Sequence, residues 1–594
     1  MFGFKKPEKS AEKKDDKSLV DSAQNGSNVK GSPSQTFQLR QMANQDKAYV
    51  SNNAYANFTK ELKSLSEKHK HLGEYLVNFT ADENNNLPEF RGRFSRGDKF
   101  PGQRNLIYPA GNGVFIHILY DPGDTRDEYI TIEPSQSEGV AEISLDVDKR
   151  LMDFIDELME AEDNEKRHEI LLECLEKICV VTEEEEVSKK KNKKVYVTQD
   201  QYDGLKYLIY RDKIGLGLIE PLITDPYIED ISCSGVGQIF VEHKILGGLK
   251  ATVTFETADD LDRYVIKLSE KISRPVTVRE PIVDAVLPDG SRINIVYGGD
   301  VSKRGSNFSI RKFTATPLSI LDLLSSGSMS YEMAAYVSLM LNEGMNTFVS
   351  GETASGKTTL LNAVSSFIPP NSKIVSIEDT PELQVPHKNW IREVVRGGSK
   401  TGAAVTMFDL LRAALRQRPN EIIIGEIRGE EGAIAFQAMQ TGHACMATFH
   451  AASVEKLIQR LTGNPINVPK TYVDNLNMVM ICAAVRLANG QQARRVLSIN
   501  EIIEYDAESN AFGFIEVFRW EPSTDTFEFP GYMNTYLLEN VVAVKRGLPP
   551  DEARSIYKDI ERRAKILKRL QERGTTNFYE LHNVISKAYR EGQF

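Results

Sequence analysis

A glycine-rich segment in the second half of the chain has the residue types and the spacing of a phosphate-binding loop. Residues 351–358 match the pattern G-x-x-x-x-G-K-[ST]. In this pattern the glycines let successive backbone N–H groups converge on phosphate oxygens, and the N-terminus of the next helix adds its positive dipole end. We expect Lys357 to neutralise the β- and γ-phosphates of ATP, and Thr358 to offer its hydroxyl to Mg²⁺. The predicted nucleotide-binding residues are Gly351, Glu352, Thr353, Ala354, Ser355, Gly356, Lys357 and Thr358.

Three later apolar runs end on residues that could act on a bound phosphate. The runs 373–377, 421–425 and 444–449 are followed by Glu378, Glu426 and His450. In open parallel sheets, ligands bind at the carboxyl ends of the strands, where a P-loop also lies. A carboxylate there can orient the attacking water as a general base, or hold Mg²⁺ through its water shell. Each could instead be a strand-end residue that faces solvent, but their order behind a P-loop favours the catalytic interpretation.

The sequence also predicts the strands and helices that would position these residues. Residues 318–505 alternate short strand-like runs with helical patterns, which is typical of a parallel sheet with crossover helices. The glycine-rich segment lies between a strand-like run, 347–350, and a helix-like run, 358–367, as phosphate binding requires. The predicted fold class is therefore α/β.

The rest of the chain divides by composition and periodicity. The first 55 residues are polar and cannot bury enough apolar surface to fold. Strand-like alternation follows over 105–133, amphipathic helices over 145–180, and a charge-segregated linker near 183–194. The predicted domains are a disordered tail (1–55), an extra N-terminal α+β domain with the charged linker (56–195), an α/β domain (196–315), the nucleotide-binding domain (316–510) and a mostly helical C-terminal region (511–594).

Bulk composition excludes several classes of protein. The 594 residues are 41% hydrophobic and 26% charged, which is typical of a multi-domain globular protein. We expect neither a membrane span nor a signal peptide, because no apolar run approaches about 20 residues. Five cysteines without a CxxC pair argue against a disulfide framework or a four-thiolate zinc site, and favour the cytoplasm. The net charge of -11 disfavours nucleic-acid coating, although a local basic channel could exist within it.

Four motifs together resemble the secretion-ATPase superfamily, whose members drive type II secretion, type IV pili and archaella. In that family, residues 351–359, which include Thr359, correspond to the Walker A motif, 376–379 to the Asp box, 424–429 to the Walker B motif and 441–450 to the His box. The resemblance implies a RecA-like P-loop core with ATP and Mg²⁺ as cofactors. It implies that Glu378 is the catalytic base, that Glu426 helps position Mg²⁺ and its water, and that His443 and His450 sense or orient the γ-phosphate.

The resemblance reaches back to about residue 201 and favours the archaeal branch of the family. Bacterial secretion members often carry a tetracysteine zinc module, which this chain lacks. Family members use arginines across a subunit boundary, and the candidates here are Arg292 and Arg311, with Arg304 behind them. These arginines could instead pair with local acids such as Asp289. Residues 105–134 look like the extra N-terminal domain of archaeal members, whose expected role is docking to partners.

The resemblance implies a homohexameric ATPase motor on the inner face of the cell membrane. It would dock from the cytoplasm on a polytopic membrane platform protein and drive the assembly or secretion of pilin-like subunits, turning about a hinge at 315–317. Peripheral contact with the membrane is expected, and nucleic acid is not an expected partner. Three alternatives stay open: an archaellum motor, a DNA-translocating conjugation ATPase, and a nucleotide-dependent scaffold that binds ATP without turnover.

Overall fold

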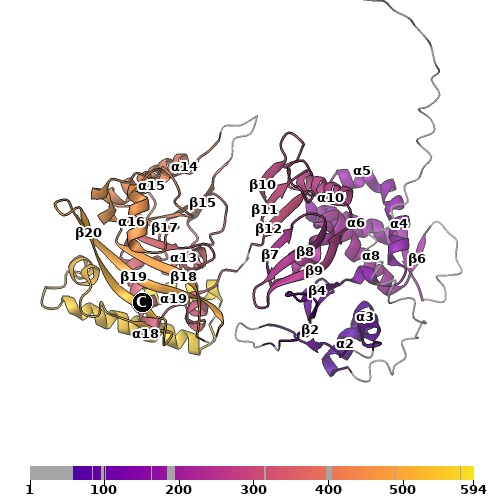
Figure 1. The fold of residues 1–594 in the computed structure, drawn as a ribbon, viewed down its shortest axis with the longest axis horizontal. Coiled ribbons are helices and arrows are strands. Elements are labelled where there is room, and N and C mark those ends of the chain that lie inside the picture. Colours follow the sequence, from indigo (N-terminus) through magenta and orange to yellow (C-terminus); the bar gives the residue numbers. More distant parts are fainter. Residues whose placement is uncertain are drawn as a thin grey trace, which may run out of the picture. The chain divides into compact units, whose positions relative to one another are not determined.

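The computed structural model describes residues 58–82, 85–94, 100, 102–161, 163–183, 194–313, 316–396, 404–488, 490–575 and 577–594. The predicted disordered tail over 1–55 lies outside these residues, as do most of the charged linker and Ala315 of the predicted hinge. The chain forms two compact units, shown in Figure 1. Unit 1 holds the described residues up to Asp284 together with Ile293–Arg311, and unit 2 holds Ala285–Arg292 and Lys312–Phe594.

Unit 1 is built on a ten-stranded sheet with the order β1-β2-β3-β4-β9-β8-β7-β12-β11-β10. Its strands are β1 (Glu89–Phe90), β2 (Asn105–Gly111), β3 (Val114–Leu119), β4 (Glu128–Ile132), β7 (Ile228–Cys233), β8 (Gly237–His243), β9 (Gly247–Phe255), β10 (Ile282–Val286), β11 (Arg292–Val296) and β12 (Asn307–Arg311). A separate pair, β5 (Cys179–Val181) and β6 (Val195–Val197), runs parallel. The strands predicted over 105–133 and 228–242 are confirmed.

The extra N-terminal domain and the α/β domain, which the sequence separates, share this one sheet. Strand β4 pairs in parallel with β9, so that Tyr129 is opposite Ala251. The hydroxyls of Tyr108 and Tyr129 both donate to the Oδ2 atom of Asp225 at 2.7 Å. Burial together with the nearby Asp225 carboxylate raises the pKa of both phenols well above 10.0, so they stay protonated and act as donors. The boundary predicted at 195/196 therefore does not separate two independent sheets.

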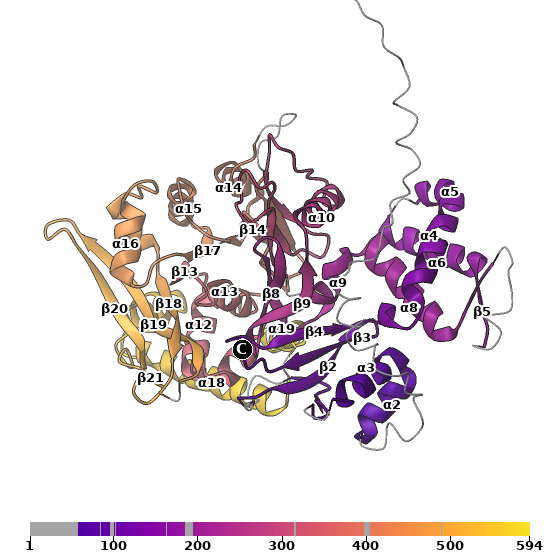
Figure 2. The ribbon, with the colours of Figure 1, turned by 45° about the vertical axis from the view of Figure 1, so that its right-hand side comes forward.

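The helices of unit 1 form two groups, visible in Figure 2. Helices α2 (Lys60–Lys68) and α3 (Lys70–Thr80) contribute Leu62, Leu72 and Leu76 to a core with Ile107 and Phe115 of the sheet. The second group shares another apolar core and consists of α4 (Val140–Leu151), α5 (Ile155–Met159), α6 (Asn164–Ile178) and α8 (Gln199–Ile209). Other helices of unit 1 are the π-helix Tyr210–Ile214, α9 (Glu220–Thr224), α10 (Ala258–Lys271) and the short 3-10 helices Pro134–Gln136, Met152–Phe154 and Gly217–Ile219.

Unit 2 is built on a nine-stranded sheet with the order β15-β14-β16-β17-β13-β18-β19-β20-β21. Its strands are β13 (Thr347–Gly351), β14 (Ile374–Glu378), β15 (Trp390–Val394), β16 (Glu421–Ile424), β17 (Ala444–Phe449), β18 (Met478–Arg486), β19 (Gln492–Asp506), β20 (Ala511–Glu521) and β21 (Thr526–Glu528). The first six strands in this order run parallel, and β18 to β21 pair antiparallel. The carboxyl ends of β13, β14, β16 and β17 therefore lie at one edge.

Helices cover both faces of this sheet because its strands are apolar on both sides. Ile423 packs in one apolar core, whereas its neighbours Ile422 and Ile424 pack in the other. One face carries α11 (Ile320–Ser325), α12 (Tyr331–Asn342), α13 (Lys357–Ser365), α18 (Tyr557–Glu572) and α19 (Phe578–Arg590), and the other carries α14 (Met407–Ala414), α15 (Glu431–Gln440) and α16 (Val454–Thr462), as Figures 1 and 2 show. The predicted α/β class with a RecA-like P-loop core is confirmed.

The prediction of a mostly helical region over 511–594 needs correction at its start. Residues 511–528 form β20 and β21, which extend the sheet of unit 2. The physical reason is an aromatic and β-branched run, 512–520, followed by a polar turn at 522–525. The helices that follow include the π-helix Leu537–Val542, α17 (Ala543–Lys545), α18 and α19. Within the described ranges, none of the helices combines the length and the apolar character that a bilayer crossing requires.

Candidate nucleotide-binding site

The predicted P-loop links the end of β13 to the start of α13. Gly356 is the N-cap of α13 and has a φ of 89°, a left-handed conformation that glycine adopts without strain. Gly351 lies against the backbone of Cys482 in β18. A Cβ atom at Gly351 would collide with the carbonyl oxygen of Cys482 and lie 2.7 Å from Ser355 Oγ. Since Gly356 has no side chain, the first N–H groups of α13 are left for another acceptor. The loop thus fits an anionic phosphate group.

Lys357 lies within this loop, as predicted. Its Nζ atom donates to the carbonyl oxygens of Gly351 at 3.0 Å and Glu352 at 2.8 Å. Burial lowers the pKa of Lys357, and the nearby carboxylate of Glu426 opposes this effect. Thr358 and Thr359 occupy the first turn of α13 and are partly exposed. The structure therefore brings the cation, two hydroxyls and a carboxylate to one end of the sheet.

Glu426 follows β16 at the same edge and is linked to the end of β14. Its Oε2 atom accepts a hydrogen bond of 2.7 Å from Arg428 Nη2, and Arg428 Nη1 lies 3.6 Å from Asp379 Oδ2. Burial raises the pKa of Glu426, but Arg428, Lys357 and His450 together outweigh it and hold the pKa below its usual value. Glu426 is therefore a carboxylate at neutral pH, as a Mg²⁺ site requires. Sequence reasoning missed Arg428, although it lies inside the Walker B segment.

Glu378 ends β14 as a buried carboxyl group that accepts several hydrogen bonds. Its side chain is only 1% exposed, and Oε1 accepts hydrogen bonds from the backbone N–H groups of Glu382 at 2.7 Å and Leu383 at 2.6 Å. The Oε2 atom accepts a hydrogen bond of 3.2 Å from Arg392 Nε. Burial raises the pKa of Glu378, and these hydrogen bonds only partly offset the effect. Both oxygens of Glu378 thus hold the loop that follows β14, and its role as catalytic base stays a prediction.

That loop carries a second glutamate, which sequence reasoning missed. Glu382 is 36% exposed at its side chain, and its charge acts on both Lys357 and Arg428. Its Oε1 atom accepts a hydrogen bond of 2.9 Å from Arg292. The signal in the sequence was available, since Glu382 follows Pro381 only four residues after Glu378. Of the two glutamates, Glu382 has the carboxylate that can reach a ligand.

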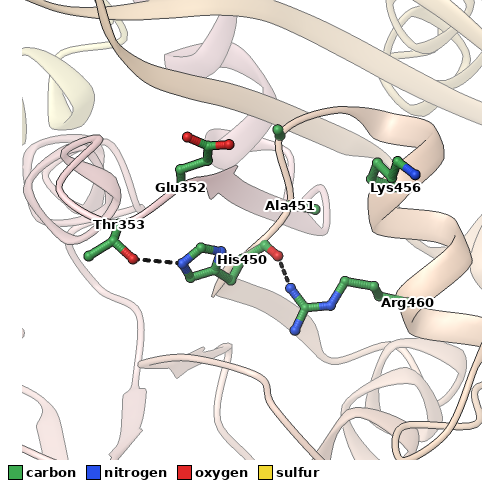
Figure 3. Close-up of a pocket in the computed structure, with 7 residues that line it drawn as sticks. Glu352, Thr353, His450, Ala451, Lys456 and Arg460 are labelled. Atoms are coloured by element: carbon green, nitrogen blue, oxygen red, sulfur yellow. Dashed lines mark hydrogen bonds between the residues drawn. The ribbon is translucent and has the colours of Figure 1, made fainter.

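His450 reaches the P-loop directly from the end of β17. Its Nε2 atom lies 2.9 Å from the Oγ1 atom of Thr353, as Figure 3 shows. Its carbonyl oxygen accepts a hydrogen bond from Arg460, a residue of α16 whose guanidinium also lies over the ring of Phe449. An open pocket beside the P-loop is lined by Glu352, Thr353, His450, Ala451, Ala452, Lys456 and Arg460. Arg460 and Lys456 are further residues that the motif search did not single out.

His443 does not join the site within this chain. It precedes β17 and lies at the amino end of the strand, whereas His450 follows the carboxyl end. The six-residue strand between them is about 20 Å long. His443 Nδ1 lies 3.1 Å from the hydroxyl oxygen of its near neighbour Thr441. Within this chain only His450 of the two contacts the P-loop, and the role of both histidines at a γ-phosphate stays a prediction.

The candidate trans-acting arginines form ion pairs with local acids. Arg292, which belongs with unit 2, donates to Glu382 and to the hydroxyl of Thr380. In unit 1, Arg311 Nε donates to Asp230 Oδ1 at 3.1 Å, and the Arg311 side chain is 59% exposed. Arg304 is also exposed in unit 1, and its carbonyl oxygen accepts from the N–H group of Val236. Their role between subunits stays a prediction.

A further arginine touches the P-loop from β19. Arg494 Nε donates to the carbonyl oxygen of Ala354 at 3.1 Å, and its Cδ atom lies 3.2 Å from where a Cβ of Gly356 would be. No motif marked this residue, because β19 follows the His box by some forty residues and has no P-loop pattern of its own. Its contact shows that the antiparallel half of the sheet also shapes the loop.

Comparison with known proteins places the chain in a family. The family model described as type II/IV secretion system protein matches residues 212–508, which are 297 of the 594 residues. The uncharacterized protein MJ0900 of Methanocaldococcus jannaschii is 44% identical over 543 residues, covering 90% of this chain and 97% of the relative. The type IV secretion system protein PtlH of Bordetella pertussis is 31% identical over 316 residues, covering 47% of this chain and 91% of the relative.

Among solved structures, the Legionella pneumophila ATPase DotB aligns with 62% of this chain and 94% of its own, at 16% identity and a TM-score of 0.37. The match to the family model includes the P-loop, the Glu426 segment and both histidines. With half of its residues matched by the family model and nine-tenths aligned to an archaeal relative, the chain belongs to the type II/IV secretion system protein family.

Proposed function

We propose that this protein hydrolyses ATP and uses the energy as a motor subunit of a type II/IV secretion or pilus-type machine. The observation that carries the proposal is the convergence of four strand ends on the P-loop. Lys357 follows β13, Glu426 follows β16 and His450 follows β17, while the loop after β14 presents Glu382. Such convergence supplies a cation, carboxylates and a polar contact around a single phosphate cradle.

The residues that would hold the nucleotide follow from this arrangement. The N–H groups of the loop and the first turn of α13 would bind the phosphate oxygens, with Lys357 between the β- and γ-phosphates. The hydroxyl of Thr358 and the carboxylate of Glu426 would hold Mg²⁺. When bound, Mg²⁺ neutralises charge on the phosphates and helps to orient them for in-line attack.

We assign the role of positioning the attacking water to Glu382 rather than Glu378. A general base must have a free oxygen within reach of the water, and its geometry matters before its pKa. Glu382 is partly exposed beside Lys357 and Arg428, whereas both oxygens of Glu378 accept hydrogen bonds within the protein. Glu378 would act as a positioning residue that fixes the backbone of Glu382.

The finer parts of the proposal concern assembly and work. The motor would be a hexamer, docked on a polytopic membrane platform protein, that drives the assembly or secretion of pilin-like subunits. Support comes from the relative named for a type IV secretion system and from the family model. The exposed Arg311 is the candidate to reach a neighbouring subunit's nucleotide, where such an arginine can contribute about 10³ to 10⁵ in rate.

The experiment that tests the proposal is ATP hydrolysis measured against protein concentration, with the molecular mass of the particles determined in parallel. Turnover should rise cooperatively as oligomers form. Lys357→Ala should abolish both nucleotide binding and turnover, while Lys388→Ala, which removes an exposed lysine of the same unit, should change neither. Binding without turnover in every condition would overturn hydrolysis in favour of a scaffold, and stimulation by single-stranded DNA alone would favour translocation.

A further inference from the structure

The outer surface of α4 and α5 carries an apolar stripe that the core of unit 1 does not use. The inner face of these helices packs on α6 through Val140, Val147 and Leu151, which are buried. The outer residues Leu145, Met152, Ile155 and Met159 are 46%, 64%, 46% and 78% exposed. Leu145 lies in α4, Met152 begins the 3-10 turn Met152–Phe154 that joins the two helices, and Ile155 and Met159 lie in α5. The four side chains thus follow one another at spacings of seven, three and four residues. Four large apolar side chains in one row point to a binding surface.

A row of acidic side chains runs along the same helices. Its members are Glu142, Asp146, Asp153, Asp156 and Glu160, with spacings of four, seven, three and four residues. All five are exposed. Asp146 pairs with Arg150 at 3.0 Å, whereas Asp153, Asp156 and Glu160 form no ion pair with any residue that the structure describes. The segment thus offers an apolar stripe and, beside it, carboxylates without counter-charges.

We infer that this surface binds a basic amphipathic helix of a partner protein. The apolar side of such a helix would cover Leu145, Met152, Ile155 and Met159, and its lysines or arginines would pair with Asp153, Asp156 and Glu160. The stripe covers residues 145–159, and a partner helix of about 15 residues would have about four turns and a length of about 22 Å. Methionine adapts its shape to different apolar neighbours, so Met152 and Met159 suit this mode of recognition.

Charge complementarity favours this partner over two others. An anionic membrane surface would be repelled by the acidic row, because lipid headgroups of the cytoplasmic leaflet attract lysine and arginine instead. A second copy of the same face would bring another acidic row and leave the carboxylates uncompensated. Cytoplasmic segments of membrane proteins are rich in lysine and arginine, so they can supply the required helix. The inference concerns unit 1 and does not depend on ATP hydrolysis by unit 2.

The test uses the full chain and a fluorescein-labelled model peptide of about 15 residues, with leucines on one helical face and lysines on the other. Fluorescence anisotropy measures its binding to the wild type and to two variants. The acidic-row variant, Asp153→Lys with Asp156→Lys and Glu160→Lys, reverses the three charges of the row that form no ion pair with a described residue. The stripe variant, Met152→Ser with Met159→Ser, removes two of the four apolar side chains. Each variant should weaken binding at least tenfold, as losing central contacts does. Thermal melting should show both variants folded, because the replaced side chains are exposed.

The matched control is Glu169→Lys with Glu173→Lys and Glu176→Lys, which makes the same charge change on exposed acids of α6. Its binding should stay within about twofold of the wild type. A scrambled peptide of the same composition should bind at least tenfold more weakly, because it forms no apolar face. The inference is overturned if the wild type does not bind the peptide, if the scrambled peptide binds equally, or if the control variant loses binding as the acidic-row variant does. It is also overturned if anionic vesicles bind through Met152 and Met159 while the peptide does not.

Discussion

The Nε2 atom of His450 lies 2.9 Å from the hydroxyl oxygen of Thr353, so that the end of β17 contacts the P-loop directly. His443, at the other end of the same strand, is outside this contact. The two histidines of the 441–450 motif can therefore be compared by mutation, one in contact with the P-loop and one not. We predict that His450 transmits the state of a bound phosphate within its own subunit and that His443 does not.

We predict that His450→Ala lowers kcat by about 10²-fold, because a small misplacement of the loop is enough to disturb the reacting geometry. Nucleotide affinity should change little, since the backbone N–H groups of the loop remain. His443→Ala should change kcat less than about threefold. Both variants are measured by steady-state hydrolysis and by equilibrium binding of a fluorescent nucleotide. If His443→Ala abolishes turnover of the oligomer, His443 acts on a neighbouring subunit, and our separation of the two residues is wrong.

A second prediction distinguishes the two glutamates of the loop after β14. Glu382→Gln should keep nucleotide binding and lower turnover by about 10² to 10⁴, because the amide cannot accept a proton from water. Glu378→Gln should chiefly lower the thermal stability of unit 2, since it replaces the carboxylate that pairs with Arg392. Hydrolysis and thermal melting are compared for both variants. Full activity in Glu382→Gln, together with an inactive but stable Glu378→Gln, would restore Glu378 as the base.

The third prediction concerns a buried ion pair of unit 1, between Arg211 and Glu133. Arg211 Nη1 donates to Glu133 Oε2 at 2.9 Å, and both side chains are nearly inaccessible to solvent. Glu133→Gln leaves the guanidinium with less counter-charge in a buried site, and we expect a loss of about 2 to 4 kcal/mol in the free energy of unfolding of unit 1. Asp146→Asn, which breaks an exposed pair with Arg150, should cost less than about 0.5 kcal/mol. Hydrogen exchange of β4 and α8 measures the loss of stability in each variant. Equal losses in Glu133→Gln and Asp146→Asn would contradict the prediction.

The fourth prediction follows from Glu421, which begins β16 and is 3% exposed. Burial raises its pKa to about 8, and its Oε1 atom has no hydrogen-bond partner among the described residues. The folded state therefore keeps a proton that the unfolded chain releases near pH 4.5. Stability from this group is complete below pH 4.5 and is lost as the pH rises towards 8.

Glu421→Gln, which resembles the protonated acid, should therefore raise the stability of unit 2 by about 1 to 3 kcal/mol at pH 8 and change it little at pH 4.5. The fluorescence of Trp390 and Trp520 follows unfolding, since both tryptophans lie in unit 2. Glu455→Gln is a control, because that carboxyl is not deeply buried and its pKa is lowered by the hydroxyl of Ser453. An equal change at both pH values would show that Glu421 does not carry the effect.

Regular patterns allowed much of the fold to be predicted from sequence. The P-loop and the strands that end at Glu378, Glu426 and His450 follow from local signals, because apolar runs and glycine spacing are properties of short segments. Strands β20 and β21 were missed although aromatic residues mark them. They are followed by the longer helices α18 and α19, whose periodicity is the stronger signal in this region. The sharing of one sheet by β4 and β9 depends on pairing between segments more than a hundred residues apart, which no local pattern encodes.

The arrangement of the candidate site was predicted less completely for a similar reason. Sequence order shows that Glu378 ends a strand, but only the packing shows that its oxygens accept hydrogen bonds from Glu382 N, Leu383 N and Arg392. The direction of a side chain at a strand end depends on the loop that follows it. Arg494 illustrates the same limit, since its contact with the P-loop comes from a distant strand.

Strand β19 links the nucleotide site to the C-terminal helices. Near its start, Arg494 holds the P-loop, and seven residues later the carboxylate of Glu501 accepts hydrogen bonds from the hydroxyl of Tyr336 at 2.6 Å and from the backbone N–H groups of Tyr536 at 2.8 Å and Leu537 at 3.1 Å. The strand is hydrogen-bonded on both sides, to β18 and β20, and its pairing with β20 shifts register between Ile499 and Asn500 and between Ile502 and Glu504. Through Arg494 and Glu501, a displacement of the P-loop would be transmitted along β19 to the π-helix that begins at Leu537.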